Sequence, residues 1–90
     1  IIYTDVWTSM GQEKESRTRL NDFNGFTVTT EMLSLADPES IFLHCLPAHP
    51  NEEVTQEVLD SSYSRIWKQA ENRMHSARGA IAFLLSNEEV

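Results

Sequence analysis

The chain is poor in the features that mark several classes of protein. Its only cysteine, Cys45, cannot form a disulfide within the chain, so nothing indicates an oxidising compartment. With three glycines and three prolines in 90 residues, it has neither a collagen-like nor a low-complexity composition. The longest apolar run near the C-terminus, residues 80–85, is far too short to span a bilayer. These absences leave a globular composition that suffices for at most one small domain.

Basic residues are also scarce. The 7 lysines and arginines are outnumbered by 14 acidic residues, which gives a formal charge of −7. A nucleic acid or an anionic membrane needs a basic face on its partner, so we predict that neither binds this chain. No signal peptide opens the sequence. Ile1 is not an initiator residue, however, so we expect the natural chain to begin upstream, and targeting cannot be read.

The order of the segments predicts an α/β fold. Apolar or β-branched stretches predict three strands, at residues 1–7, 26–28 and 41–43. Residues 65–67 are a candidate for a fourth strand. Three helices are predicted. A threonine is the candidate cap of residues 29–36 and Asn51 the cap of residues 51–60, while apolar residues at helical spacing predict the helix at residues 72–86. Residues 12–20 read as a solvated helix or turn. Strands that alternate with helices favour a parallel, Rossmann-like sheet with crossover helices, here a partial domain that ends in an amphipathic helix.

Two polar clusters directly follow predicted strands. One covers residues 5–11 and the other residues 44–49. In open parallel sheets, ligands bind beyond the carboxyl ends of the strands. We therefore expect both clusters to contribute to one site.

The residues of the second cluster allow several interpretations. A cysteine beside a histidine can be an activated nucleophile, but adjacent residues on an extended segment point in opposite directions, which disfavours a pair between His44 and Cys45. A metal site made of His44, Cys45 and His49 lacks a fourth ligand and any recognisable zinc spacing, so we predict no metal. A buried structural cysteine at a strand end is the plain alternative.

Three segments together resemble a known family. His44-Cys45-Leu46-Pro47, which follows an apolar strand, is similar to the signature of the ornithine carbamoyltransferase family. Residues 3–13, Tyr-Thr-Asp-Val-Trp-Thr-Ser-Met-Gly-Gln-Glu, resemble the ornithine-binding loop of that family. Residues 70–73, Ala-Glu-Asn-Arg, resemble its late segment before the last helix. Their order and rough spacing match over nearly the whole chain.

The resemblance implies an enzyme that transfers a carbamoyl group from carbamoyl phosphate to the δ-amine of ornithine, giving citrulline and phosphate in arginine biosynthesis or the urea cycle. Orientation and electrostatics suffice for this reaction, so we expect no cofactor and no covalent intermediate. The family has two α/β domains and forms homotrimers, in the cytoplasm or, in eukaryotes, the mitochondrial matrix. Residues 1–90 would then be the C-terminal part of the ornithine-binding domain, without the carbamoyl-phosphate domain and inactive alone.

The first cluster would bind the amino acid, as the resemblance implies. Asp5 would accept a hydrogen bond from an ammonium group of ornithine, which suits a carboxylate. Ser9 and the backbone of Met10 would hold the α-amino-acid end, and Gly11 would allow the loop to turn tightly. The plain alternatives are a turn aspartate for Asp5 and core packing for the Met10 side chain.

The other motifs would bind the carbamoyl group. His44 would donate to the carbamoyl oxygen, while Cys45 and the Leu46 carbonyl would hold the carbamoyl nitrogen and the incoming amine. Pro47 would fix the backbone so that the carbonyls point into the site. Arg73 would reach carbamoyl phosphate as a permanently charged fork. Its plain alternative is a surface arginine at a helix start.

Other features receive plain interpretations. Residues 16–19, Ser-Arg-Thr-Arg, look like the phosphate loop of the family but lack a residue and lie in a charged helical stretch, so we interpret them as a coincidence. Structural or surface roles are expected for four residues: Trp7, His49, Trp67 and His75. Two rival functions remain, a carbamoyltransferase for putrescine or a modified ornithine and a non-catalytic α/β module. The Ser9–Gly11 loop argues against putrescine, which has no α-amino-acid end.

Overall fold

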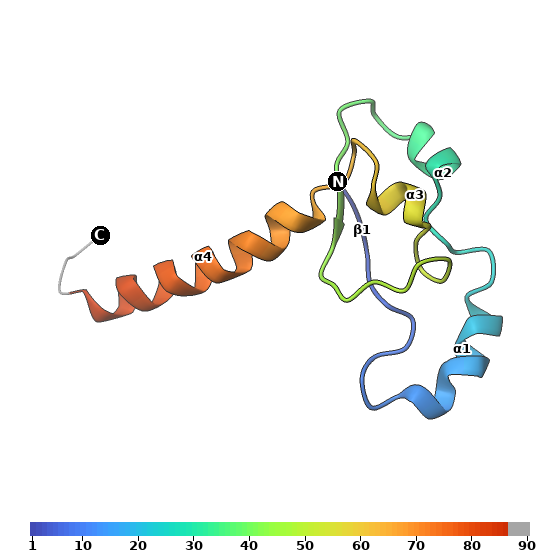
Figure 1. Cartoon of the computed structure of the whole chain (residues 1–90), viewed down its shortest axis with the longest axis horizontal. Coiled ribbons are helices and arrows are strands. Elements are labelled where there is room, and N and C mark those ends of the chain that lie inside the picture. Colours follow the sequence, from blue (N-terminus) through green and yellow to red (C-terminus); the bar gives the residue numbers. More distant parts are fainter. Residues whose placement is uncertain (87–90) are drawn as a thin grey trace.

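Two short parallel strands lie side by side at the centre of the described chain, residues 1–86 of this computed structural model (Figure 1). β1 (Ile2–Thr4) pairs with β2 (Phe42–His44) so that Thr4 lies opposite His44. The predicted parallel α/β arrangement is therefore confirmed, although β1 is shorter than residues 1–7. Because the strands end in register, the residues that follow Thr4 and His44 are neighbours at one edge of the sheet.

The connection from β1 to β2 includes three short helical segments. It contains a 3-10 helix η1 (Glu13–Glu15), α1 (Ser16–Asp22) and α2 (Thr30–Ser34). Thr29 caps α2 as its hydroxyl accepts a hydrogen bond from the Met32 amide at 3.2 Å, which confirms the predicted threonine cap.

The predicted strand at residues 26–28 is wrong. Only Val28 pairs, in an isolated parallel bridge with Val54. The segment has only three residues between Gly25, which has a φ of +93°, and Thr29, the cap of α2. Of these three, only Val28 forms backbone hydrogen bonds to the neighbouring segment, with Glu53 and Thr55.

The helix after β2 begins later than predicted. α3 (Gln56–Leu59) is capped by Thr55, whose hydroxyl accepts from the Val58 amide at 3.4 Å. Asn51 is not a cap, because its φ of +69° is left-handed and its amide donates to the Val54 carbonyl within a turn. This turn carries Glu53 and Val54 into the core instead of leaving them on a helix surface.

The last helix is longer than predicted. α4 (Ile66–Leu85) contains the whole predicted segment up to Leu85 and begins where residues 65–67 were expected to form a strand. That strand prediction is wrong, because Ser64 alone forms a bridge to Phe42 and Ile66 already packs into the core as the first helical residue.

α4 projects away from the rest of the molecule (Figure 1). The predicted apolar stripe exists on it but is exposed: Met74, Ile81, Leu84 and Leu85. Among the helices of residues 1–86, none has the length and hydrophobicity needed to cross a membrane.

A small core joins the strands to the short helices and the start of α4. Its buried members come from β2, α2, α3, α4 and the Val28–Val54 bridge: Val28, Leu33, Phe42, Val54, Val58, Leu59 and Ile66. The core fixes the position of β2, and therefore the position of the residues that follow it.

Candidate active site

The two polar clusters meet where the strands end, as the sequence predicts. Cys45 follows β2, and its Sγ donates a hydrogen bond to Asp5 Oδ1, after β1, at 3.2 Å. The same carboxylate oxygen accepts from the Val6 amide at 2.7 Å. Asp5 is exposed and Cys45 is partly buried, so the pair lies at the surface with one side available to a ligand.

The protonation states of this pair follow from their contact. Hydrogen bonds from the Cys45 thiol and the Val6 amide hold the pKa of Asp5 below its ordinary value. Burial raises the pKa of the Cys45 thiol, and the neighbouring Asp5 carboxylate raises it further. At neutral pH the pair is therefore a carboxylate and a neutral thiol, which argues against Cys45 as an activated nucleophile.

Arg73 reaches the same strand end from α4. Its Nη2 donates to the Cys45 carbonyl oxygen. Arg73 lies in the middle of α4, so the alternative of a surface arginine at a helix start is wrong. It also lines an open cavity of about 740 Å³ together with Cys45 and two further cations, Arg65 and Lys68.

The Ser9–Gly11 loop borders a second cavity. This cavity, of about 550 Å³, lies between the loop and the segment after β2, with Ser9 and Met10 among its lining residues on one side and Pro47 on the other. Gly11 has a φ of +89°, which confirms the predicted tight turn. The side chain of Met10 is 92% exposed, so core packing is wrong for it.

The base of this loop is anchored to α1. The Trp7 carbonyl accepts a hydrogen bond from Arg19 Nη1 at 2.7 Å, and the Trp7 ring stacks on Phe23 at a centroid distance of 5.4 Å. Arg19 also pairs with Glu15 at 3.0 Å. Arg19 and Trp7 therefore have structural roles.

Two other residues lie on the surface of α4. His75 pairs with Glu71 at 3.1 Å, one helical turn away, and Trp67 is 72% exposed. Both therefore lie on the surface, as expected.

His44 does not face the site. Its side chain is fully buried, and its Nε2 lies 2.8 Å from Glu53 Oε1 while its Nδ1 accepts a hydrogen bond from the Leu46 amide at 2.8 Å. Alternation along β2 explains this placement, because Phe42 and His44 point into the core. The structure therefore leaves His44 no free ring nitrogen for a carbamoyl oxygen, and the predicted donation does not fit.

The structure reveals Glu53 as a residue that sequence reasoning missed. Glu53 is 0% exposed, and its Oε1 also accepts from the His49 amide at 2.8 Å. In the sequence, Glu52-Glu53 looks like the acidic first turn of a helix, and only the turn at residues 50–54 reveals that Glu53 is buried.

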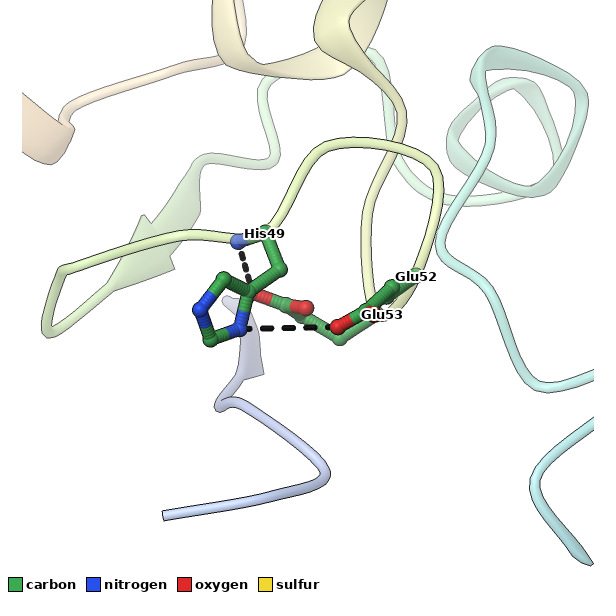
Figure 2. Close-up of side chains that lie close together, drawn as sticks. All are labelled: His49, Glu52 and Glu53. Atoms are coloured by element: carbon green, nitrogen blue, oxygen red, sulfur yellow. Dashed lines mark hydrogen bonds and ion pairs between the residues drawn. The ribbon is translucent and has the colours of Figure 1, made fainter. Parts of the chain in front are cut away.

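The side chains of Glu53, His49 and Glu52 lie close together (Figure 2). One potential ligand atom from each lies within 4.8 Å of the others, and His49 Nδ1 is 3.5 Å from Glu52 Oε2. Glu53 Oε1 is already occupied by two donors from the chain. Its Oε2, in contrast, has no hydrogen-bond partner among the described residues, so His49, Glu52 and Glu53 together offer three potential ligands, one fewer than a closed zinc site needs.

Gln69 is a second residue that the sequence did not indicate. Its Oε1 accepts from the His44 amide at 3.0 Å, and its Nε2 donates to the Tyr3 hydroxyl at 3.2 Å. One side chain of α4 thus connects both strands just before Asp5 and Cys45.

Known proteins are similar to this chain in sequence and in fold. Residues 1–84 match the family model of the aspartate/ornithine carbamoyltransferase Asp/Orn binding domain. The chain is 56% identical over 84 residues to the ornithine carbamoyltransferase of Thermus thermophilus, a match that covers 93% of this chain and 28% of that protein. It is 50% identical over 88 residues to the enzyme of Nostoc punctiforme, covering 98% of this chain and 29% of that protein.

A solved structure agrees with these matches. The ornithine carbamoyltransferase of Pyrococcus furiosus superposes with a TM-score of 0.85 at 46% identity, over 98% of this chain and 28% of that one. The chain therefore spans less than a third of the length of the curated relatives that it matches.

Proposed function

Because the chain belongs to the aspartate/ornithine carbamoyltransferase family, we propose that it is the C-terminal part of the ornithine-binding domain of an ornithine carbamoyltransferase. Such an enzyme joins the δ-amine of ornithine to the carbonyl carbon of carbamoyl phosphate, breaks the bond from that carbon to the phosphate oxygen, and releases citrulline and phosphate. The observation that carries this proposal is the meeting of three separate motifs at one strand end. Asp5 contacts Cys45, and Arg73 contacts the Cys45 carbonyl.

Asp5 is the proposed partner of an ornithine ammonium group. Its lowered pKa keeps it charged at neutral pH, and an exposed carboxylate can accept charge-assisted hydrogen bonds from an ammonium ion. Its present contacts use Oδ1, which leaves Oδ2 for a ligand. Ser9 and the Met10 amide would hold the α-amino-acid end, which the exposure of both residues permits.

Cys45 and Leu46 are the proposed contacts of the reacting groups. A neutral thiol and a backbone carbonyl can hydrogen-bond the carbamoyl nitrogen and the incoming amine without forming a bond to carbon. The raised pKa of Cys45 supports this role over covalent catalysis. Rate acceleration then comes from orientation of the amine toward the carbonyl.

Arg73 is the proposed contact for carbamoyl phosphate on this part of the enzyme. The described residues around its cavity include three cations and no carboxylate, in a chain with a net charge of −7. Such local positive charge favours a phosphate-bearing ligand. The remaining phosphate contacts would come from a carbamoyl-phosphate domain outside this chain.

We extend the proposal from the family to the complete enzyme. It would be a homotrimer that needs no cofactor, in the cytoplasm or the mitochondrial matrix, and would serve arginine biosynthesis or the urea cycle. Putrescine or a modified ornithine is the rival substrate. The match of this chain to ornithine carbamoyltransferases at 50% identity and above supports ornithine.

A chimaera tests the function. Residues 1–84 of this chain replace the matched segment of the Thermus thermophilus enzyme, with which they are 56% identical. The chimaera should form citrulline from carbamoyl phosphate and ornithine. A folded chimaera that binds carbamoyl phosphate but makes no citrulline would contradict the proposal.

A further inference from the structure

Two buried residues, His44 and Glu53, form hydrogen bonds with the loop that carries Cys45 and Leu46. The Leu46 amide donates to His44 Nδ1 at 2.8 Å, so Nδ1 carries no proton and the ring proton is on Nε2. Nε2 therefore donates to Glu53 Oε1 at 2.8 Å. The result is a continuous chain of hydrogen bonds from Glu53 through the imidazole to the backbone of Leu46.

Glu53 also holds the far end of the loop. Its Oε1 accepts from the His49 amide at 2.8 Å, so one buried oxygen fixes both His44 and His49. The four residues between them are Cys45, Leu46, Pro47 and Ala48, and both ends of this short segment are bound to the same carboxylate. Side chains of His44 and Glu53 are both fully buried, so solvent does not compete for these bonds.

Leu46 has an unusual backbone conformation that these bonds explain. Its φ is +62°, in the left-handed region that a branched, non-glycine residue rarely adopts. Such a conformation persists only where the surroundings impose it. The bond from the Leu46 amide to His44 Nδ1 is a contact that opposes relaxation of this residue.

We propose that His44 and Glu53 are positioning residues that hold the Leu46 backbone, and with it the Cys45 and Leu46 carbonyls, in the orientation the reaction needs. This inference rests on the proposed function. It replaces direct donation from His44 to substrate, because both ring nitrogens already have protein partners. A misplacement of about 1 Å in a reacting group lowers the rate about 10²-fold, so a small relaxation of Leu46 has a measurable effect.

Two substitutions of His44 in the chimaera separate its two contacts. In His44→Asn, the amide oxygen can take the place of Nδ1 and keep the bond to Leu46, but the side chain is too short to reach Glu53. In His44→Gln, the longer side chain can keep the bond to Glu53 but not the one to Leu46. The two variants therefore break opposite ends of the hydrogen-bond chain.

We expect the less stable of the two His44 variants to be the more active one. His44→Asn should have the lower Tm, because a buried carboxylate loses a donor, yet retain kcat within about 10-fold. His44→Gln should have the higher Tm of the two but lose kcat by about 10²-fold, with little change in KM for carbamoyl phosphate. Glu53→Gln, which keeps an acceptor oxygen, should retain more activity than Glu53→Leu.

A merely structural role predicts that kcat and Tm fall in the same order, and that result would overturn the proposal. So would a folded His44→Gln variant with unchanged kcat. Hydrogen exchange at the Leu46 amide gives a readout that does not depend on turnover, and it should be faster in His44→Gln than in His44→Asn. If the chimaera makes no citrulline but shows this exchange pattern, the proposed function fails while the positioning contact stands.

Discussion

At the scale of single residues, the site depends on the contact between Asp5 and the Cys45 thiol. Its two members come from strands 40 residues apart, yet the sequence predicted their meeting, because polar residues that directly follow parallel strands share one edge of the sheet. The orientation of His44 also follows from alternation along β2. The role inferred from resemblance placed it at the substrate instead, and the geometry does not support that placement.

Glu53 could not be predicted in the same way. Two acids before an apolar residue are typical of the first turn of a helix, where the helix dipole favours them. What buries Glu53 is a turn in which Asn51 takes a left-handed φ of +69° and donates to Val54. The partners that stabilise a buried carboxylate, His44 and the His49 amide, are set by tertiary structure.

Removal of the charge on Asp5 tests its proposed role. In the chimaera, Asp5→Asn keeps the shape but loses the charged acceptor, and charge-assisted hydrogen bonds contribute about 1.5–3 kcal/mol. We expect kcat/KM for ornithine to fall by about 10- to 100-fold, with the Kd of carbamoyl phosphate unchanged. Asp22→Asn, an equal change of charge at an exposed position of α1, is the control and should retain full activity. An equal loss of kcat/KM in both variants would contradict a specific role for Asp5.

The reactivity of Cys45 tests the electrostatics of the pair. Burial and the Asp5 carboxylate raise the pKa of the thiol, so little thiolate exists at neutral pH and alkylation of Cys45 by iodoacetamide should be slow. The rate should rise as the pH increases toward the raised pKa. In Asp5→Asn the pKa should fall, and alkylation at fixed pH should be faster than in Asp22→Asn. Peptide mapping by mass spectrometry measures this rate, and rapid alkylation of the unsubstituted chimaera at neutral pH would contradict a neutral thiol.

At the scale of elements, the sequence predicted the kinds of structure better than their limits. The parallel strands and the threonine cap of α2 are confirmed, because each depends on local chemistry. The errors at residues 26–28 and 65–67 share a cause, because at each place a single bridge to a distant segment replaces the local preference: Val28 with Val54, and Ser64 with Phe42. At residues 51–55 a local turn closed by the bridge between Pro50 and Val54 takes the place of the first helical turn.

The cap of α2 offers a test at this scale. Thr29→Ala removes the hydroxyl that accepts from the Met32 amide, which costs about 1 kcal/mol. We expect hydrogen exchange at the Met32 amide to become about 5-fold faster in the chimaera, as that free energy implies. Thr18→Ala, at an exposed position inside α1, removes the same groups without removing a cap and should leave the Met32 amide unaffected. Unchanged exchange in Thr29→Ala would show that the cap does not stabilise α2.

At the scale of the whole molecule, the chain holds one half of the proposed site. Asp5, Cys45 and Arg73 meet in it, while the cavity at Arg73 is open, and the chain spans less than a third of its relatives. We therefore expect the isolated 90 residues to form no citrulline, whereas the chimaera does. A colorimetric citrulline assay on both proteins makes the comparison. Turnover by the isolated chain would contradict the assignment of carbamoyl-phosphate binding to a separate domain.

The central claim is that this chain binds the α-amino-acid end of ornithine, and competition between two amines tests it most directly. Putrescine carries the same amine but lacks the groups that the Ser9–Gly11 loop would hold. A site built to hydrogen-bond a group rejects an analogue without it by about 10⁴-fold or more, because its own polar groups are left unpaired. The chimaera should therefore prefer ornithine over putrescine in kcat/KM by about that factor. Equal or better use of putrescine would contradict the ornithine assignment and leave only the carbamoyltransferase class.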